Sequence, residues 1–282
     1  MYYRLNAFEM PKPARYTLDD ALYLMSRLRD PQDGCPWDIK QSYKDIVPHT
    51  IEECYELADA IANGDMAHTA EELGDVLFQV IFYAQLGKEE GCFDFDSVVN
   101  GLVDKLVRRH PHVFPHGDLH QRFGAQTKET KDIKATWEAI KRKERADKQQ
   151  GGVLDDVPIA LPALSRAQKL QKRAASVGME WPTLAAVFGA LESELQELKD
   201  AIESGNEADI TDEAGDVLFS VVNVIRHLKL DAEAVLRQSS VKFSSRIAAM
   251  ESHCETNNTQ MSDLEEAELE ALWQQVKRQL QE

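Results

Sequence analysis

Acidic side chains recur in pairs, three residues apart, in two separate parts of this chain of 282 residues. The pairs are Glu53 with Glu56, Glu72 with Asp75, Glu194 with Glu197, and Glu213 with Asp216. Residues three apart share one face of a helix, so each pair would project from a single helical face. Converging carboxylates repel one another unless cations neutralise them, and oxygen ligands without His or Cys suit Mg²⁺, with Mn²⁺ as a substitute. The pattern predicts a divalent metal site in each half of the chain.

A solvated helix face is the alternative interpretation of such an acidic pair. It is the simpler one for a single pair, but two pairs repeated at identical spacing in both halves favour the metal site. A di-iron bundle also gathers carboxylates between helices, although it characteristically needs Glu-x-x-His pairs. The chain contains no such pair.

Basic and aromatic residues follow each acidic group in the same order. A Lys and an Arg four residues apart would place two cations on one helix face, which suits a phosphate chain, although salt bridges to nearby acids are the alternative. A Trp followed four residues later by Lys could stack on a base or fill the core. The candidate substrate-binding residues are Lys105, Arg109, Trp137 and Lys141 in the first half and Lys242, Arg246, Trp273 and Lys277 in the second. No GxxxxGKS or GxxxxGKT loop is present, so metal and side chains would have to hold any nucleotide.

An internal duplication explains why these residues recur. Residues 53–78 align without a gap on residues 194–219, with 14 identities in 26 positions. A duplicated unit changes the expected number of domains. We therefore expect two homologous domains, residues 1–150 and 151–282, with the boundary in the polar, glycine-containing stretch from Gln149 to Gly152.

The elements that must position these residues are helices. Apolar residues in both copies recur at three and four residues, and no convincing stretch alternates as a strand would. Gly64 suits the left-handed residue after a helix, Asp65 suits the cap of the next helix, and Ser204-Gly205-Asn206 repeats this arrangement. The sequence predicts an all-α protein of two helical bundles. Gly74 and Gly215, each inside an acidic pair, further predict the close approach of a neighbouring helix or a ligand.

The composition limits the classes of partner. A formal net charge of −17 disfavours a nucleic-acid partner and an anionic membrane surface. The chain has no apolar run of 18 residues and no start of the signal-peptide type, so we expect a cytoplasmic protein. Its four cysteines are far apart and lack zinc-site spacing, which predicts reduced thiols.

A cluster of histidines stands between the two copies, at positions 110, 112, 116 and 120. Prolines at 111 and 115 interrupt it, and the second copy has no counterpart. We therefore expect a structured connecting segment here rather than a metal site. The charged run over residues 127–148 predicts a helix with a solvated face.

Longer motifs across the chain resemble the MazG group of the all-α nucleoside triphosphate pyrophosphohydrolase family. The resemblance covers nearly the whole chain, from about residue 18 to residue 278. The motifs are GCPWD (34–38), EECYE (52–56), EELGD (71–75), RRHPHVF (108–114), LQKRAASVGMEW (170–181) and EAGD (213–216).

This resemblance implies Mg²⁺-dependent hydrolysis of nucleoside triphosphates to monophosphate and pyrophosphate, broad base tolerance and a homodimer. It also implies catalysis in the second copy. Carried onto this chain, it makes Glu194, Glu197, Glu213 and Asp216 the catalytic metal ligands. Lys242 and Arg246 would contact phosphates, and Trp273 and Lys277 would lie by the nucleotide. The first copy keeps a matching residue at every one of these positions, so the residues alone do not decide between the copies.

Three other functions stay open at this level. One is a narrower pyrophosphohydrolase that acts on dUTP or a phosphoribosyl nucleotide. The second is a helical module that binds metal and nucleotide without hydrolysis. The third is a helical interaction protein whose acidic residues are merely solvated, although the duplicated arrangement argues against it.

Overall fold

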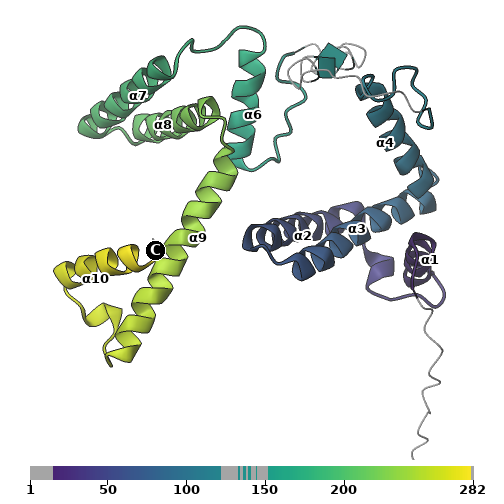
Figure 1. Ribbon diagram of the computed structural model, residues 1–282, viewed down its shortest axis with the longest axis horizontal. Helices are drawn as coiled ribbons and strands as arrows, with labels where there is room; N and C mark the ends of the chain where they lie inside the picture. Colours follow the sequence, from purple (N-terminus) through teal and green to yellow (C-terminus); the bar gives the residue numbers. More distant parts are fainter. Residues whose placement is uncertain are drawn as a thin grey trace, which may run out of the picture. The chain divides into compact units, whose positions relative to one another are not determined.

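The computed structural model describes residues 15–121 and 152–280, together with a few single positions between these ranges. Every regular element in these residues is a helix, so the predicted all-α class is confirmed. The chain divides into two compact units, Met1–Lys141 and Arg142–Glu282, and each is described by itself (Figure 1). The predicted boundary falls on residues 149–151, which lie outside the described residues, and it stays a prediction.

Both units are built around one long helical hairpin. The helices of the first unit are α1 (Leu18–Leu28), α2 (Tyr43–Asn63), α3 (Met66–Glu89) and α4 (Phe95–Arg109), with a short 3₁₀ helix, η1 (Asp38–Lys40), before α2. Those of the second are α6 (Ala163–Ala175), α7 (Leu184–Ser204), α8 (Glu207–His227), α9 (Ala232–Thr256) and α10 (Glu266–Gln279), with η2 (Met261–Asp263) before α10. Helix α2 packs along α3 and α7 packs along α8 (Figure 1).

Matching caps close the two hairpins. Gly64 and Gly205 end α2 and α7 in the left-handed conformation, with φ of 72° and 73°. The side chains of Asp65 and Asn206 then accept hydrogen bonds from the first backbone N–H groups of α3 and α8. These contacts satisfy groups that a helix start leaves without partners. The turn predicted between the helices is therefore confirmed in both copies.

The core of the first unit lies where α1, α2 and α3 meet. Its buried residues are Met25, Ile46, Ile81, Phe82 and Leu86. The Arg29 guanidinium lies over the Phe82 ring, 5.2 Å from its centroid, and pairs with Glu89 at 2.7 Å. This cation is buried, and the ion pair keeps its charge compensated there.

The second unit has its largest buried cluster where α10 packs on α9. Met250 and Cys254 of α9 meet Leu272 and Val276 of α10. The hairpin of α7 and α8 buries smaller residues, and α6 packs against α8 and α9. No large aromatic residue is fully buried in the described part of this unit, whereas Phe82 fills the first.

The segment after α4 consists of turns as far as residue 121. The His110 ring lies 5.6 Å from the His112 ring and 6.1 Å from the Trp137 ring. Most of the charged run over residues 127–148, including Lys141, lies outside the described residues. No helix in the described ranges has the length and apolar character to cross a membrane.

We predict that Gly205→Ala lowers the free energy of unfolding of the second unit by about 1 kcal/mol, because a Cβ is disfavoured at positive φ. Gly189→Ala, inside α7, is the matched control, since a Cβ there meets no atom within 4 Å. It should stabilise the helix by roughly 0.5–1 kcal/mol. Urea unfolding of the full-length variants measures both effects, and equal stability of the two variants would contradict the prediction.

Candidate functional site

The two hairpins each bring carboxylates together across the helix pair. In the first unit, oxygens of Glu53, Glu56 and Glu72 all lie within 4.8 Å of one another. The second unit gathers Glu194, Glu213 and Asp216 within the same distance. Each group draws on both helices of its hairpin, because paired acids at a spacing of three face the neighbouring helix.

The carboxylates repel one another electrostatically. Burial, followed by the charges of Asp75, Glu56 and Glu72, raises the pKa of Glu53. Burial, followed by the charges of Glu197 and Asp216, raises the pKa of Glu194, and the pKa of Glu213 is raised in the same way. The charge of Asp75 thus raises the pKa of a residue in the first group of three, and the charge of Glu197 does the same in the second, although neither belongs to these groups.

The first acidic group has an unsatisfied oxygen that a cation would satisfy. Glu72 is buried, and its Oε2 atom has no hydrogen-bond partner. A buried carboxylate oxygen without a partner is costly unless a cation or donor approaches it. The oxygen-only donor set is also what Mg²⁺ and Mn²⁺ prefer. The residues present thus fit a divalent ion.

Two of the predicted metal ligands, Asp75 and Glu197, lie outside the groups of three. His68, which was not predicted, contacts the first group. Glu197 accepts a hydrogen bond from the Ser193 hydroxyl at 2.9 Å, one turn back on α7. In the first unit, the other oxygen of Glu72 pairs with His68 Nε2 at 2.7 Å. His68 escaped the sequence analysis because its counterpart in the second copy is Asp209, so the repeat gave no pattern to find.

The glycines inside the acidic pairs face open space. A Cβ built on Gly74 or Gly215 would meet no atom within 4 Å in the described residues. No neighbouring helix among the described residues approaches these glycines, so the first of the two predicted neighbours is not found and the second, a ligand, stays a prediction. The glycine backbone beside the carboxylates leaves room for a ligand.

The candidate phosphate-binding residues of the second unit lie on a different helix pair. Arg246 of α9 is buried, with its guanidinium 5.4 Å from the centroid of Trp273 on α10. Its Nε atom has no hydrogen-bond partner. Within residues 152–280, neither Lys242 nor Arg246 forms a salt bridge, so that alternative explanation for the two cations does not hold there. Lys277 is half-buried on the same helix as Trp273.

Their counterparts in the first unit are only partly described. Lys105 and Arg109 lie half-buried on α4, as their helical spacing predicted. Trp137 lies beside His110, and Lys141 is outside the described residues. The structure thus places each basic pair on a single helix, as the spacing predicted.

A cavity of about 380 Å³ opens beside the acidic group of the second unit. Glu194 is one of its lining residues and so belongs to both features. Apolar side chains from α6, the loop after it and α8 form most of the wall, among them Leu170, Trp181 and Phe219. Apolar periodicity does not predict this cavity, because its walls come from segments far apart in the sequence.

An ion cluster braces one side of this cavity. Glu180 accepts hydrogen bonds from Arg226 at 2.6 and 2.8 Å, and His227 Nε2 lies 2.8 Å from the same carboxylate. The Arg226 hydrogen bonds, with help from His227, lower the pKa of Glu180 to about 2. The loop after α6 is therefore tied to the end of α8 by a carboxylate that stays ionised.

A helical hairpin that gathers carboxylates beside a cavity suits an enzyme that acts on phosphate compounds through divalent ions. Comparisons with known proteins bear on this class. A family model described as the MazG nucleotide pyrophosphohydrolase domain matches residues 41–114 and again residues 183–249. The two matches cover both hairpins, which confirms the internal duplication.

Relatives match along most of the chain. The nucleoside triphosphate pyrophosphohydrolase of Escherichia coli is 44% identical over 264 residues, which are 93% of this chain and 97% of the relative. The nucleoside triphosphate pyrophosphohydrolase/pyrophosphatase MazG of Thermotoga maritima is 38% identical over 266 residues, 94% of this chain and 98% of the relative. The chain belongs to the MazG family of nucleotide pyrophosphohydrolases, and the prediction that it is such a hydrolase is confirmed.

We predict that Glu213→Gln stabilises the second unit at pH 7 when a chelator removes metal ions. The raised pKa of Glu213 means that the folded state holds this proton more tightly than the unfolded state does. Stability therefore falls as pH rises from the ordinary value of 4.5 upward, and the variant escapes this loss. The advantage should disappear below about pH 4, where the carboxyls of both states are protonated.

Urea unfolding with EDTA or with Mg²⁺ measures the difference. Mg²⁺ should stabilise the wild type more than Glu213→Gln, because binding to the folded state adds to its stability. Glu203→Gln, an acid of α7 outside the group, should respond to Mg²⁺ as the wild type does. Equal stabilisation of wild type and Glu213→Gln would remove Glu213 from the metal site.

Proposed function

We propose that this protein hydrolyses nucleoside triphosphates to nucleoside monophosphate and pyrophosphate, with Mg²⁺ as cofactor and Mn²⁺ as a substitute. The observation that carries the proposal is the group of three carboxylates on α7 and α8, with oxygens within 4.8 Å of one another and Glu194 open to a cavity. The family and the names of its relatives in Escherichia coli and Thermotoga maritima support the reaction.

The carboxylates would divide into two roles. Glu194, Glu213 and Asp216 form the tight group and would hold the metal ions. Glu197 stands beside this group with one oxygen on Ser193, and its second oxygen can orient an attacking water and take its proton. In the first unit, Glu53, Glu56 and Glu72 form the tight group and would hold metal, with Asp75 beside them.

A bound divalent ion would neutralise the triphosphate oxygens and lower the pKa of a water near the α-phosphorus. The chain itself supplies position and charge. Lys242 and Arg246 would pair with phosphate oxygens, and Trp273 with Lys277 would lie by the nucleotide. Arg246 has a buried Nε atom without a partner, which an anion would satisfy.

We place catalysis in the second unit. Its acidic group adjoins a cavity, whereas the pocket shown for the first unit is lined by none of the acidic group there. The residues at the first site would still bind a metal ion and contribute to stability. A wide range of bases is expected, and a binding module without turnover is the second candidate.

We further propose that two copies of the chain associate and that the enzyme acts in the cytoplasm, without a nucleic-acid or membrane partner. Leu236, Val241 and Phe243 of α9 are each more than half exposed. Leu236 and Phe243 are seven residues apart and therefore share one face of α9, which would be the contact surface.

Product analysis tests the reaction. Purified protein with Mg²⁺ and each of the common ribo- and deoxyribonucleoside triphosphates should release monophosphate and pyrophosphate. Glu197→Gln should lower kcat by about 100-fold or more, because a positioned base contributes roughly that much. Glu56→Gln changes the aligned residue of the first unit and should keep most of the activity.

Other products would decide against the proposal. Diphosphate with orthophosphate would move the attack away from the α-phosphorus. Tight binding of a nonhydrolysable triphosphate without turnover would favour the binding module. Loss of activity in Glu56→Gln alone would place catalysis in the first unit.

Light scattering on a size-exclusion column tests the association. The wild type should elute with the mass of a dimer, and Leu236→Glu should shift toward the monomer, because a charge is costly in an apolar contact. A wild type that stays monomeric at micromolar concentration would contradict the proposal.

A further inference from the structure

The cavity of the second unit has two polar groups whose free atoms are fixed by the surrounding protein. Gln171 of α6 is buried, and its Nε2 atom donates to the Phe219 carbonyl at 2.8 Å. A carbonyl can only accept, so the amide oxygen of Gln171 must be the atom left over. This Oε1 atom is buried and has no partner. Gln171 lines the cavity, and its buried Oε1 atom is an unused hydrogen-bond acceptor in that wall.

Asn223 of α8, which also lines the cavity, supplies a hydrogen-bond donor. Its Oδ1 atom accepts from Arg226 Nε at 3.2 Å and from Arg226 Nη2 at 2.7 Å. A guanidinium can only donate, so the NH₂ group of Asn223 is left to point elsewhere. Glu180 holds Arg226 in place through two hydrogen bonds. The cavity therefore offers a donor that an ion cluster orients.

The rest of the wall suits a flat, apolar ring. Leu170, Ala174, Met179, Trp181 and Phe219 line the cavity. Its volume of about 380 Å³ falls within the range of roughly 300–1,000 Å³ that small-molecule sites show. Because Glu194 lines the cavity and belongs to the acidic group, a ligand here could extend directly to the bound metal.

The first unit carries a different residue at the position of Asn223. The repeat aligns Phe82 with Asn223, 141 residues later. Phe82 is completely buried among Met25, Ile46 and Ile81, and Phe78 packs edge-on against it. A core aromatic therefore occupies the position that carries the polar donor in the second unit.

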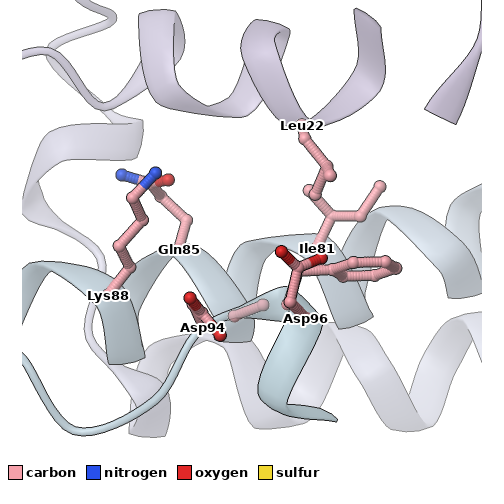
Figure 2. Close-up of a pocket in the computed structure, with 8 residues that line it drawn as sticks. Leu22, Ile81, Gln85, Lys88, Asp94 and Asp96 are labelled. Carbon is pink, nitrogen blue, oxygen red and sulfur yellow. The ribbon is translucent and has the colours of Figure 1, made fainter. Parts of the chain in front are cut away.

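The pocket shown in Figure 2 is a different feature. It lies beside α1, α3 and the start of α4, and its labelled residues include Leu22, Lys88 and Asp94. Its volume is about 110 Å³, and no carboxylate of the metal group lines it. It has neither the size nor the position to hold a nucleoside next to that metal.

We propose that the cavity between α6, α7 and α8 binds the base of the substrate, with Asn223 donating to a base carbonyl and Gln171 accepting from a neighbouring ring N–H. This inference rests on the proposed function and names its specificity residues. A base with adjacent carbonyl and N–H groups, such as uracil or guanine, fits both groups. Cytosine and adenine present an amino group where Asn223 also donates, so they bind more weakly within a broad substrate range.

Asn223→Asp tests the proposal because it replaces the donor by an acceptor and keeps the oxygen that Arg226 contacts. Isothermal titration calorimetry with the α,β-methylene analogues of UTP and CTP, in Mg²⁺, measures binding without turnover. The wild type should bind the UTP analogue with a Kd about tenfold lower than that of the CTP analogue, because one additional hydrogen bond contributes about that much to affinity. The variant should reverse this order. Gln171→Met, which removes the acceptor, should bring the ratio toward one.

Gln85→Ala is the matched control, since Gln85 aligns with Arg226 and lines the small pocket of the first unit. It should leave the ratio unchanged. The same UTP-to-CTP ratio in wild type and Asn223→Asp would overturn the proposal, as would a change of the ratio in Gln85→Ala. The proposed hydrolysis is tested separately. If the UTP-to-CTP ratio reverses in Asn223→Asp but the wild type releases no pyrophosphate, the base-binding proposal holds and the proposed hydrolysis is wrong.

Discussion

The mutual repulsion of carboxylates held on two adjacent helices is the constraint on which the rest of this structure depends. Burial and neighbouring charge raise the pKa of Glu53, Glu194 and Glu213, so the groups are costly in the protein alone. Such a cost persists where function requires it. Helical hairpins with matching left-handed glycine caps keep the acids opposed, because the caps fix the register of each helix pair.

Duplication gave the protein two copies of this arrangement, and packing has made them different. In the first unit, Phe82 completes a dense core and Arg29 lies over its ring. In the second unit, Asn223 stands at the aligned position and a cavity opens beside Glu194. A buried aromatic side chain in the first unit thus aligns with an amide of the cavity wall in the second. The acidic ligands alone do not reveal this difference, since both copies keep all four of them.

Ion pairing on the second unit links the fold to the chemistry of the cavity. Glu180 stays ionised because Arg226 and His227 hold it, and Arg226 in turn fixes the amide of Asn223. A charged network of this kind costs desolvation but sets orientation. Lys242, Arg246, Trp273 and Lys277 lie on α9 and α10, with exposed apolar residues nearby on α9.

The helical class, the duplication and the carboxylate groups follow from the sequence, because spacing along one helix determines which residues share a face. The caps at Gly64 and Gly205 follow for the same local reason. Only the tertiary structure separated Glu197 and Asp75 from the tight groups and left Gly74 and Gly215 facing open space. It also brought Gln171 and Asn223 into the wall of one cavity. Those features depend on side chains from helices far apart in the chain, and packing between elements leaves no periodic pattern in the sequence.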